Sequence, residues 1–202
     1  LHILDTFAKR EDALNRSMEF GGAGMTSMSV DERATLCNMA TECTARTGIC
    51  EGDEKLAEWL MSARPEMSAD AIRANFVMPD DNAEYAGGRH TIDLSAIKPM
   101  VATPGDPTYG ADVAELGETK IDIAYGGSCT AGKVDDFAYY AQVCQEAADA
   151  GLSVADGVEF YIQYGSYNVQ AYVEKMGWDK VFAAVGVKLI PPGCGACIGC
   201  GD

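Results

Sequence analysis

Strand-like and helical patterns alternate in the C-terminal part of this chain, and no other feature constrains the fold as strongly. Apolar runs typical of strands occupy 121–125, 158–164 and 187–190, with helical patterns over about 134–150 and 167–177 between them. A strand, a helix and a further strand in this order form a parallel sheet with helical crossovers. The sequence therefore predicts an α/β fold.

Two of the predicted strands run directly into short turns that contain glycine and cysteine. Gly127-Ser128-Cys129-Thr130 follows the first strand, and Pro192-Gly193-Cys194-Gly195-Ala196-Cys197 follows the last. The carboxyl ends of parallel strands share one edge, where open α/β sheets bind their ligands. Three thiolates without an obvious fourth partner suit an iron–sulfur cluster that leaves one iron open for chemistry. This pattern favours an enzyme over a simple electron carrier.

The pair Cys194 and Cys197 has a spacing that zinc knuckles and thioredoxin-like dithiols also use. A zinc ribbon needs a second matching pair, and a thioredoxin motif opens a helix after the first strand, so neither fits well. Cys200 extends the run and leaves three alternatives open. It is a third ligand in place of Cys129, a fourth ligand that closes the cluster, or a bystander, which we favour. The remaining cysteines show no ligand spacing and are interpreted as small core residues: Cys37, Cys43, Cys50 and Cys144.

The first 86 residues are predicted to be rich in helices. One helical pattern covers Ile3 to Phe20. Ser29 and Glu32 have the spacing of a capping box and predict a second helix that runs to about Thr47. Further helices are expected over 51–63, with Leu56, Trp59 and Leu60 facing inward, and over about 68–75.

Asn38 and Glu42 are spaced i, i+4 and would share one face of the predicted second helix. This face is either a solvated polar surface or the side of a site. Ala86-Gly87-Gly88 marks a joint, which divides the chain into a helix-rich part, 1–86, and an α/β part, 87–202. After the joint, 90–94 is predicted to be a strand and 99–110 a loop.

Composition excludes several classes of function. The 202 residues have a net charge of −16 without a basic cluster, which argues against nucleic-acid binding. No apolar run approaches the ~20 residues that a membrane helix needs. Without a visible secretory signal, the eight cysteines favour a reducing compartment, and we expect a cytoplasmic protein. The chain begins at Leu1, and we expect it to be part of a longer protein. His2 and His90 are interpreted as structural or exposed residues.

Four segments of the chain, in order and rough spacing, resemble the aconitase superfamily, which comprises aconitases, homoaconitases and large subunits of 3-isopropylmalate dehydratase. The resemblance covers nearly the whole chain. Its segments are Met18-Glu19-Phe20 with Ser29–Glu42, Ile92-Asp93-Leu94-Ser95 with Pro99–Ala102 and Pro104-Gly105, Gly127-Ser128-Cys129-Thr130, and Pro192–Gly199. It implies the central portion of an aconitase-like α/β/α fold. Two positions depart from the pattern: Ala131 stands where the family usually has Asn, and Cys200 stands where cysteine is not expected.

The resemblance also implies roles for individual residues. Cys129, Cys194 and Cys197 match the three ligands of a [4Fe–4S] cluster whose fourth iron acts as a Lewis acid. Asn38 and Glu42 match the N-M-x-x-E element at the substrate site. The implied reaction is the reversible dehydration of a 2-hydroxy di- or tricarboxylic acid. Its catalytic serine and substrate anchors are expected elsewhere, on a mobile domain or a small subunit, so this chain alone should be inactive.

Two readings from other classes stay open. In one, Cys200 completes four-thiolate ligation and the chain is an iron–sulfur redox module. In the other, the chain is a regulatory or structural relative that has kept the fold and lost catalysis.

Overall fold

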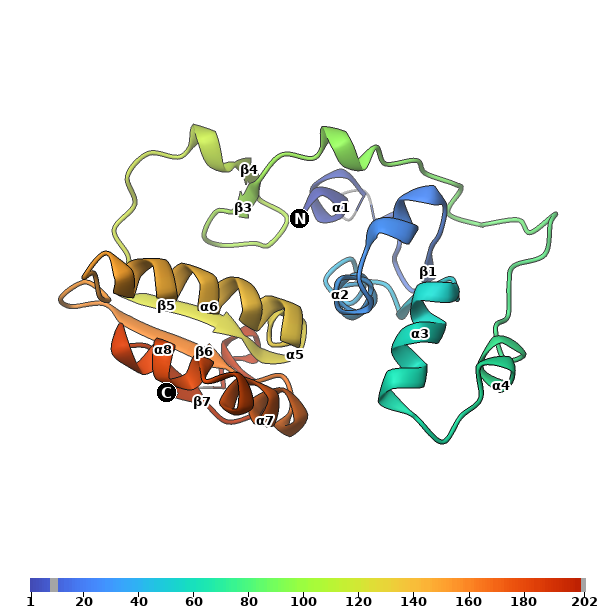
Figure 1. Cartoon of the computed structure of the whole chain (residues 1–202). Coiled ribbons are helices and arrows are strands. Elements are labelled where there is room, and N and C mark those ends of the chain that lie inside the picture. The colour runs from blue at the N-terminus through green and yellow to red at the C-terminus, as the bar shows by residue number, and fades with distance from the viewer. Residues whose placement is uncertain (8–10, 201–202) are drawn as a thin grey trace. The chain divides into compact units, whose positions relative to one another are not determined.

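The computed structural model describes residues 1–7 and 11–200. They form two compact units, which divide between Gly117 and Glu118 (Figure 1). The division after residue 86, inferred from the glycine joint, stays a prediction.

The first unit contains short helices and two pairs of strands. In chain order its elements are α1 (His2–Thr6), β1 (Ser17–Phe20), α2 (Val30–Asn38), β2 (Thr47–Cys50), α3 (Glu54–Ala63), α4 (Ala69–Arg73), β3 (Met100–Ala102) and β4 (Gly110–Asp112). β1 pairs with β2 in parallel, and β3 pairs with β4 antiparallel. One buried cluster comprises Leu4, Ala13, Ala40, Cys43 and Ala45.

The helix predicted over 3–20 is wrong in its second half. α1 ends at Thr6, residues 8–10 of the predicted segment lie outside the described residues, and 17–20 form strand β1. The pairing of Ser17–Phe20 with Thr47–Cys50 explains the difference, because backbone hydrogen bonds to a distant strand outweigh a weak local helical pattern.

The capping box at the start of α2 is confirmed. Ser29 Oγ accepts a hydrogen bond from the Glu32 backbone N–H at 3.1 Å, and Glu32 Oε2 accepts one from the Ser29 N–H at 2.7 Å. However, α2 ends at Asn38 rather than near Thr47. The chain must turn before it enters β2, and Thr44 adopts a left-handed φ of 62° in that turn.

Other predictions for the first unit had mixed outcomes. Asp53 caps α3 and Ser68 caps α4, so both helices are confirmed with shifted ends. Trp59 is 47% exposed, so the prediction that it faces inward is wrong.

The predicted strand over 90–94 is also wrong. This segment leads into a 3₁₀ turn over Leu94–Ala96, because the Asp93 carboxylate accepts a hydrogen bond from the Ser95 N–H. The predicted loop over 99–110 includes β3 and the first residue of β4.

The second unit is a parallel three-stranded sheet with helical crossovers, as predicted. Its elements are β5 (Ile123–Gly127), α5 (Ser128–Ala131), α6 (Val134–Asp149), β6 (Glu159–Gln163), α7 (Tyr167–Met176), α8 (Trp178–Ala184) and β7 (Lys188–Ile190). The strand order is β5-β6-β7, and both pairs are parallel. The α/β fold class is therefore confirmed.

One core holds the second unit together. It joins Phe137 of α6, Val173 of α7 and Phe182 of α8 to Ile162 in the central strand, and all four are fully buried. The Phe137 ring stacks on Tyr164 with their centroids 5.1 Å apart and meets Phe182 edge-on. The three helices therefore pack against the face of the sheet that carries Ile162.

Replacement of Phe137 by alanine should destabilise the second unit by about 3–5 kcal/mol, because it leaves a cavity beneath the sheet. Hydrogen exchange of amides in 118–200 would measure the loss. Tyr139→Ala is the matched control: Tyr139 lies on the same helix but is 66% exposed, so its effect should stay within about 0.5 kcal/mol. Equal effects of the two variants would contradict this account of the core.

An ion pair between the buried Arg33 and the half-buried Asp53 organises the first unit around α2. The Arg33 side chain is only 5% exposed, and its two terminal nitrogens each lie 2.7 Å from one carboxylate oxygen of Asp53. Arg33 also donates a hydrogen bond to the Met25 carbonyl at 2.7 Å. Asp53 caps α3 by accepting from the Leu56 N–H. The pair therefore ties α2 to the start of α3.

Asp53→Asn should destabilise the first unit by about 1–3 kcal/mol, because asparagine keeps the helix cap but leaves a buried guanidinium without its anion. Arg33 holds the pKa of Asp53 below its ordinary value of 3.8. The stability from this pair is therefore present above that value and is lost as the pH falls through the lower folded-state pKa. Hydrogen exchange of amides in 11–75 between pH 2 and pH 7 would follow the loss, and the variant should lack this part of the acid dependence. The exposed pair of Glu54 and Arg73 provides the control: Glu54→Gln should destabilise the first unit much less than Asp53→Asn, because water screens an exposed pair.

Candidate functional site

The carboxyl ends of the three parallel strands meet at one edge of the second unit. Gly127, the last residue of β5, pairs with Gln163 of β6, and Gln163 pairs with Ile190 of β7. Cys129 lies two residues beyond the end of β5, and Cys194 lies four residues beyond the end of β7. Both predicted cysteine turns therefore leave the same edge, on either side of Gln163.

Glycine is required where the Cys129 turn leaves the sheet. Gly127 has a φ of 104°, and a Cβ there would lie 2.0 Å from the carbonyl oxygen of Gln163. A Cβ on Gly132 would lie 2.3 Å from the Ser128 carbonyl, and the Gly165 N–H donates to the Gly132 carbonyl at 2.9 Å. The Cys129 turn thus packs directly against the backbone at the end of β6 and just after it, and only glycine, which has no Cβ, allows this close contact.

The side chains next to Cys129 place hydroxyl groups around its sulfur. Ser128, itself buried, adopts a left-handed φ of 66°, and its Oγ accepts a hydrogen bond from the Cys129 N–H at 2.6 Å. The same Oγ lies 3.7 Å from Cys129 Sγ, and Thr130 Oγ1 lies 3.9 Å from that sulfur. Hydroxyl donors at this range stabilise a thiolate and tune a metal centre bound to it.

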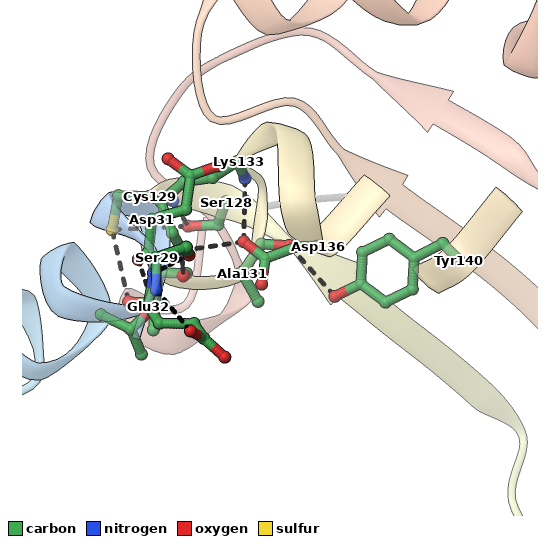
Figure 2. Close-up of polar contacts among 11 residues, drawn as sticks. Ser29, Asp31, Glu32, Ser128, Cys129, Ala131, Lys133, Asp136 and Tyr140 are labelled. Carbon is green, nitrogen blue, oxygen red and sulfur yellow. Dashed lines mark hydrogen bonds and ion pairs between the residues drawn. The ribbon is translucent and has the colours of Figure 1, made fainter. Parts of the chain in front are cut away.

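The carbonyls of the Cys129 turn are held by the first part of α6 (Figure 2). Tyr140 OH donates a hydrogen bond to the Ala131 carbonyl at 3.1 Å, and Lys133 Nζ donates to the Thr130 carbonyl. Lys133 Nζ also pairs with the Asp136 carboxylate at 2.8 Å. These contacts fix the backbone of the turn and leave Cys129 exposed.

Gln163 holds the second cysteine turn. Gln163 is only 4% exposed, and its Nε2 donates hydrogen bonds to the carbonyls of Pro191 at 3.1 Å and Cys194 at 3.5 Å. Its Oε1 accepts a hydrogen bond from the Tyr125 hydroxyl. A Cβ on Gly195 would lie 2.4 Å from that same Oε1, so glycine is needed beside Cys194 as well. One buried amide thus joins the strands to this turn.

The three predicted ligands, together with Cys200, are exposed, and the Cys200 N–H donates to the Gly195 carbonyl at 3.2 Å. Exposed thiols in two turns at one sheet edge, with hydroxyl groups beside one of them, are the chemical type of donor set that iron–sulfur clusters use. Their sulfurs do not form a metal-binding group: within residues 1–7 and 11–200, no three His, Cys, Asp or Glu side chains are arranged to hold a metal ion. The donor set thus fits such a cluster in its residue types and in its place at one sheet edge, and not in the positions of its sulfurs.

The two predicted polar site residues lie in the first unit. Asn38 is the last residue of α2, and Glu42 lies in the turn that follows, so the prediction that both share a helix face is wrong. Both are exposed, whereas their neighbours Ala40 and Cys43 are buried. This turn thus buries its apolar residues and presents its polar ones to solvent.

Sequence reasoning missed Ser128, Gln163 and Tyr125 as parts of this site. A polar residue at the inner end of a buried strand, as in Ile162-Gln163-Tyr164, is the one signal that could have pointed to Gln163. Nothing in the sequence pattern joins Gln163 to the carbonyls of a turn some 30 residues away.

Comparison with known proteins decides the family. The sequence profile of the aconitase family (aconitate hydratase) matches residues 1–119 and 109–202, which together cover the chain. The chain belongs to the aconitase family. The resemblance inferred from the four sequence segments is thereby confirmed, and the α/β fold with parallel strands agrees with it.

Curated members of the aconitase family align with nearly all of this chain. The mitochondrial homoaconitase of Cryptococcus neoformans is 34% identical over 95% of the chain, and the large subunit of 3-isopropylmalate dehydratase from Clostridioides difficile is 35% identical over 98%. Large subunit 2 of the Archaeoglobus fulgidus 3-isopropylmalate dehydratase is 31% identical over 94%. The chain spans 29% of the first, 45% of the second and 43% of the third of these relatives.

No helix among the residues that the structure describes is both long enough and apolar enough to cross a bilayer.

Gln163→Ala should loosen the Cys194 turn without unfolding the sheet. Loss of a buried amide that makes three hydrogen bonds costs about 1–3 kcal/mol, so amides in 193–200 should exchange roughly tenfold faster. Gln170→Ala is the control, because the Gln170 side chain donates its hydrogen bond to Glu174 on its own helix and not to a turn. Unchanged exchange in 193–200 would show that Gln163 does not hold this turn.

Proposed function

We propose that the protein containing this chain is an aconitase-type hydro-lyase. It catalyses the reversible dehydration of a 2-hydroxy di- or tricarboxylic acid, with Cys129, Cys194 and Cys197 as ligands of a [4Fe–4S] cluster. The observation that carries the proposal is the pair of cysteine turns at one sheet edge in a chain of the aconitase family. Relatives of this chain are named homoaconitase and 3-isopropylmalate dehydratase, and both names describe hydro-lyases.

The residues of this chain would hold the cluster, orient the substrate and transfer one proton. When bound, the cluster supplies a Lewis-acidic iron that polarises the C–O bond of the departing hydroxyl. The Glu42 carboxyl group would hold the proton that the departing oxygen takes up, and the Asn38 amide would orient the substrate by hydrogen bonds. Ser128 and Thr130 would donate hydrogen bonds to the Cys129 sulfur. The base that removes the C–H proton is expected outside this chain.

Partners and location follow from the same proposal. Two of the relatives are large subunits, which favours a further domain or a small subunit that completes the substrate site. The ligand is a small 2-hydroxy carboxylate. We propose the cytoplasm as the location because exposed thiols need a reducing compartment, although the fungal homoaconitases are named as mitochondrial.

A redox module is the second candidate, because Cys200 belongs to the same turn as Cys194 and Cys197. Its N–H bonds to the Gly195 carbonyl, so a fourth thiol lies on a backbone that folds back toward Cys194. Four thiolates would close the cluster against substrate. Cys200→Ser separates the two candidates: a hydro-lyase keeps its cluster and its activity, whereas a redox module loses the cluster.

Serine at Cys129, Cys194 or Cys197 should abolish cluster assembly, measured as iron and sulfide per chain after reconstitution of the complete protein. Glu42→Gln should keep the cluster and lower the dehydration rate by about 10²–10⁴-fold, since it removes a proton-transfer group. Cys144→Ser, in the buried core, is the control and should retain full iron content. Normal activity in both Cys129→Ser and Glu42→Gln would refute the site.

The 202-residue chain by itself should assemble a cluster but should not dehydrate any candidate acid. Measurable turnover by this chain alone would show that the base and the substrate anchors lie within it.

A further inference from the structure

Cys37 and Cys50 bring their sulfur atoms together in the first unit, although their spacing in the sequence gave no reason to pair them. Cys37 lies in the last turn of α2, and Cys50 is the last residue of β2. The two Sγ atoms are 3.5 Å apart, and both residues are half-buried thiols. We propose that Cys37 and Cys50 form a site of reversible oxidation, at which a small disulfide such as oxidised glutathione converts the two thiols to an intramolecular disulfide.

The backbone around the pair is held on both sides. β2 is paired with β1, and α2 is fixed through its capping box and the ion pair of Arg33 with Asp53. Gly48 lets the two elements approach, because a Cβ at this position would lie 2.7 Å from Cys37 Cα. Cys50 Sγ also lies 3.7 Å from the Arg33 carbonyl. Two thiols held in this way have a high effective concentration for each other.

The chemistry of the pair assigns an order to the two steps. The Cys50 thiol is directed at the Arg33 carbonyl, 3.7 Å away, and burial raises its pKa, so Cys50 stays protonated and Cys37 attacks first. Its thiolate attacks oxidised glutathione, forms a mixed disulfide and releases one glutathione thiolate, which takes up a proton.

Cys50 completes the reaction. Once Cys37 is capped, its sulfur no longer shares a hydrogen bond with Cys50, which after burial is the second cause of the raised pKa of Cys50. Cys50 gives its proton to solvent and attacks the Cys37 sulfur, which displaces the second glutathione as a thiolate that is then protonated. In total the two cysteines lose two electrons and two protons, and one oxidised glutathione becomes two reduced molecules. The new bond links the last turn of α2, next to Asn38, to β2.

Peptide mapping tests the proposal in the complete protein. The protein is equilibrated in glutathione buffers from fully reduced to fully oxidised, quenched with acid, alkylated and digested with trypsin. Cleavage after Arg33, Arg46 and Lys55 places Cys37 in peptide 34–46 and Cys50 in peptide 47–55. We expect these two peptides to become linked by a disulfide as the buffer becomes oxidising, and to separate again in reduced glutathione.

Three variants make the assignment specific. Cys43 shares peptide 34–46 with Cys37 but is buried in the cluster with Leu4 and Ala40, so Cys43→Ser should retain the link. Cys37→Ser should abolish the link, and Cys50→Ser should stop the reaction at a glutathione adduct on Cys37. In urea, where the fold is lost, the preference for Cys37 over Cys43 should disappear.

Two results would overturn the proposal. One is a linked peptide that persists in Cys37→Ser, which would make Cys43 the partner. The other is complete alkylation of Cys37 and Cys50 in fully oxidised glutathione while native hydrogen exchange in 11–75 shows the first unit to be folded. Neither result depends on the cluster or on hydro-lyase activity, so the test is independent of the proposed function.

Discussion

The parallel pairing of β5, β6 and β7 determines where every part of the candidate site in the second unit lies. Its register sets Gly127, Gln163 and Ile190 side by side, and the two cysteine turns begin within a few residues of that line. Because the turns cross the backbone after β6 at very short range, glycine occupies the points of contact. The sheet edge therefore dictates both the location of the thiols and the small residues around them.

Gln163 shows how a buried polar group connects strand pairing to loop position. An amide buried at the end of β6 must satisfy its donors and its acceptor, and it does so with Tyr125 on one side and the carbonyls of Pro191 and Cys194 on the other. If the Cys194 turn moved away, the Gln163 amide would be buried without hydrogen-bond partners. The free-energy cost of that state holds the turn at the edge of the sheet. Ser128 and Lys133 act similarly at the Cys129 turn, by bonding to groups of the turn itself.

The first unit uses a different device, a buried ion pair. Arg33 reaches the Asp53 carboxylate and the Met25 carbonyl, so one side chain connects α2, the cap of α3 and the 3₁₀ turn over Ala23–Ser27. The ion pair fixes α2 beside α3, and Cys37, in the last turn of α2, lies with its sulfur 3.5 Å from that of Cys50. Asn38, the first residue of the N-M-x-x-E element, thus lies at the end of α2, and Glu42 lies in the turn beyond it.

Local sequence determined much of this protein. The alternation of strand and helix from about residue 120 predicted β5, α6, β6, α7 and β7 and their parallel order, because hydrophobic period and turn residues are local signals. The separate helix α8 in the second crossover was not predicted. Capping at Ser29 and Ser68 was also readable, since a cap involves residues only three apart. The cysteine turns and the family resemblance came from the sequence as well, and the family is confirmed.

Tertiary structure alone decided the elements that depend on distant partners. Residues 17–20 became a strand, and α2 stopped at Asn38, because β1 and β2 pair across some thirty residues of sequence. The contacts of Gln163 and the approach of Cys37 to Cys50 likewise join segments that no local pattern relates. Intrinsic helix and strand propensities differ by only a few tenths of a kcal/mol per residue. Burial and hydrogen bonding between distant segments contribute more, so they decide which secondary structure forms.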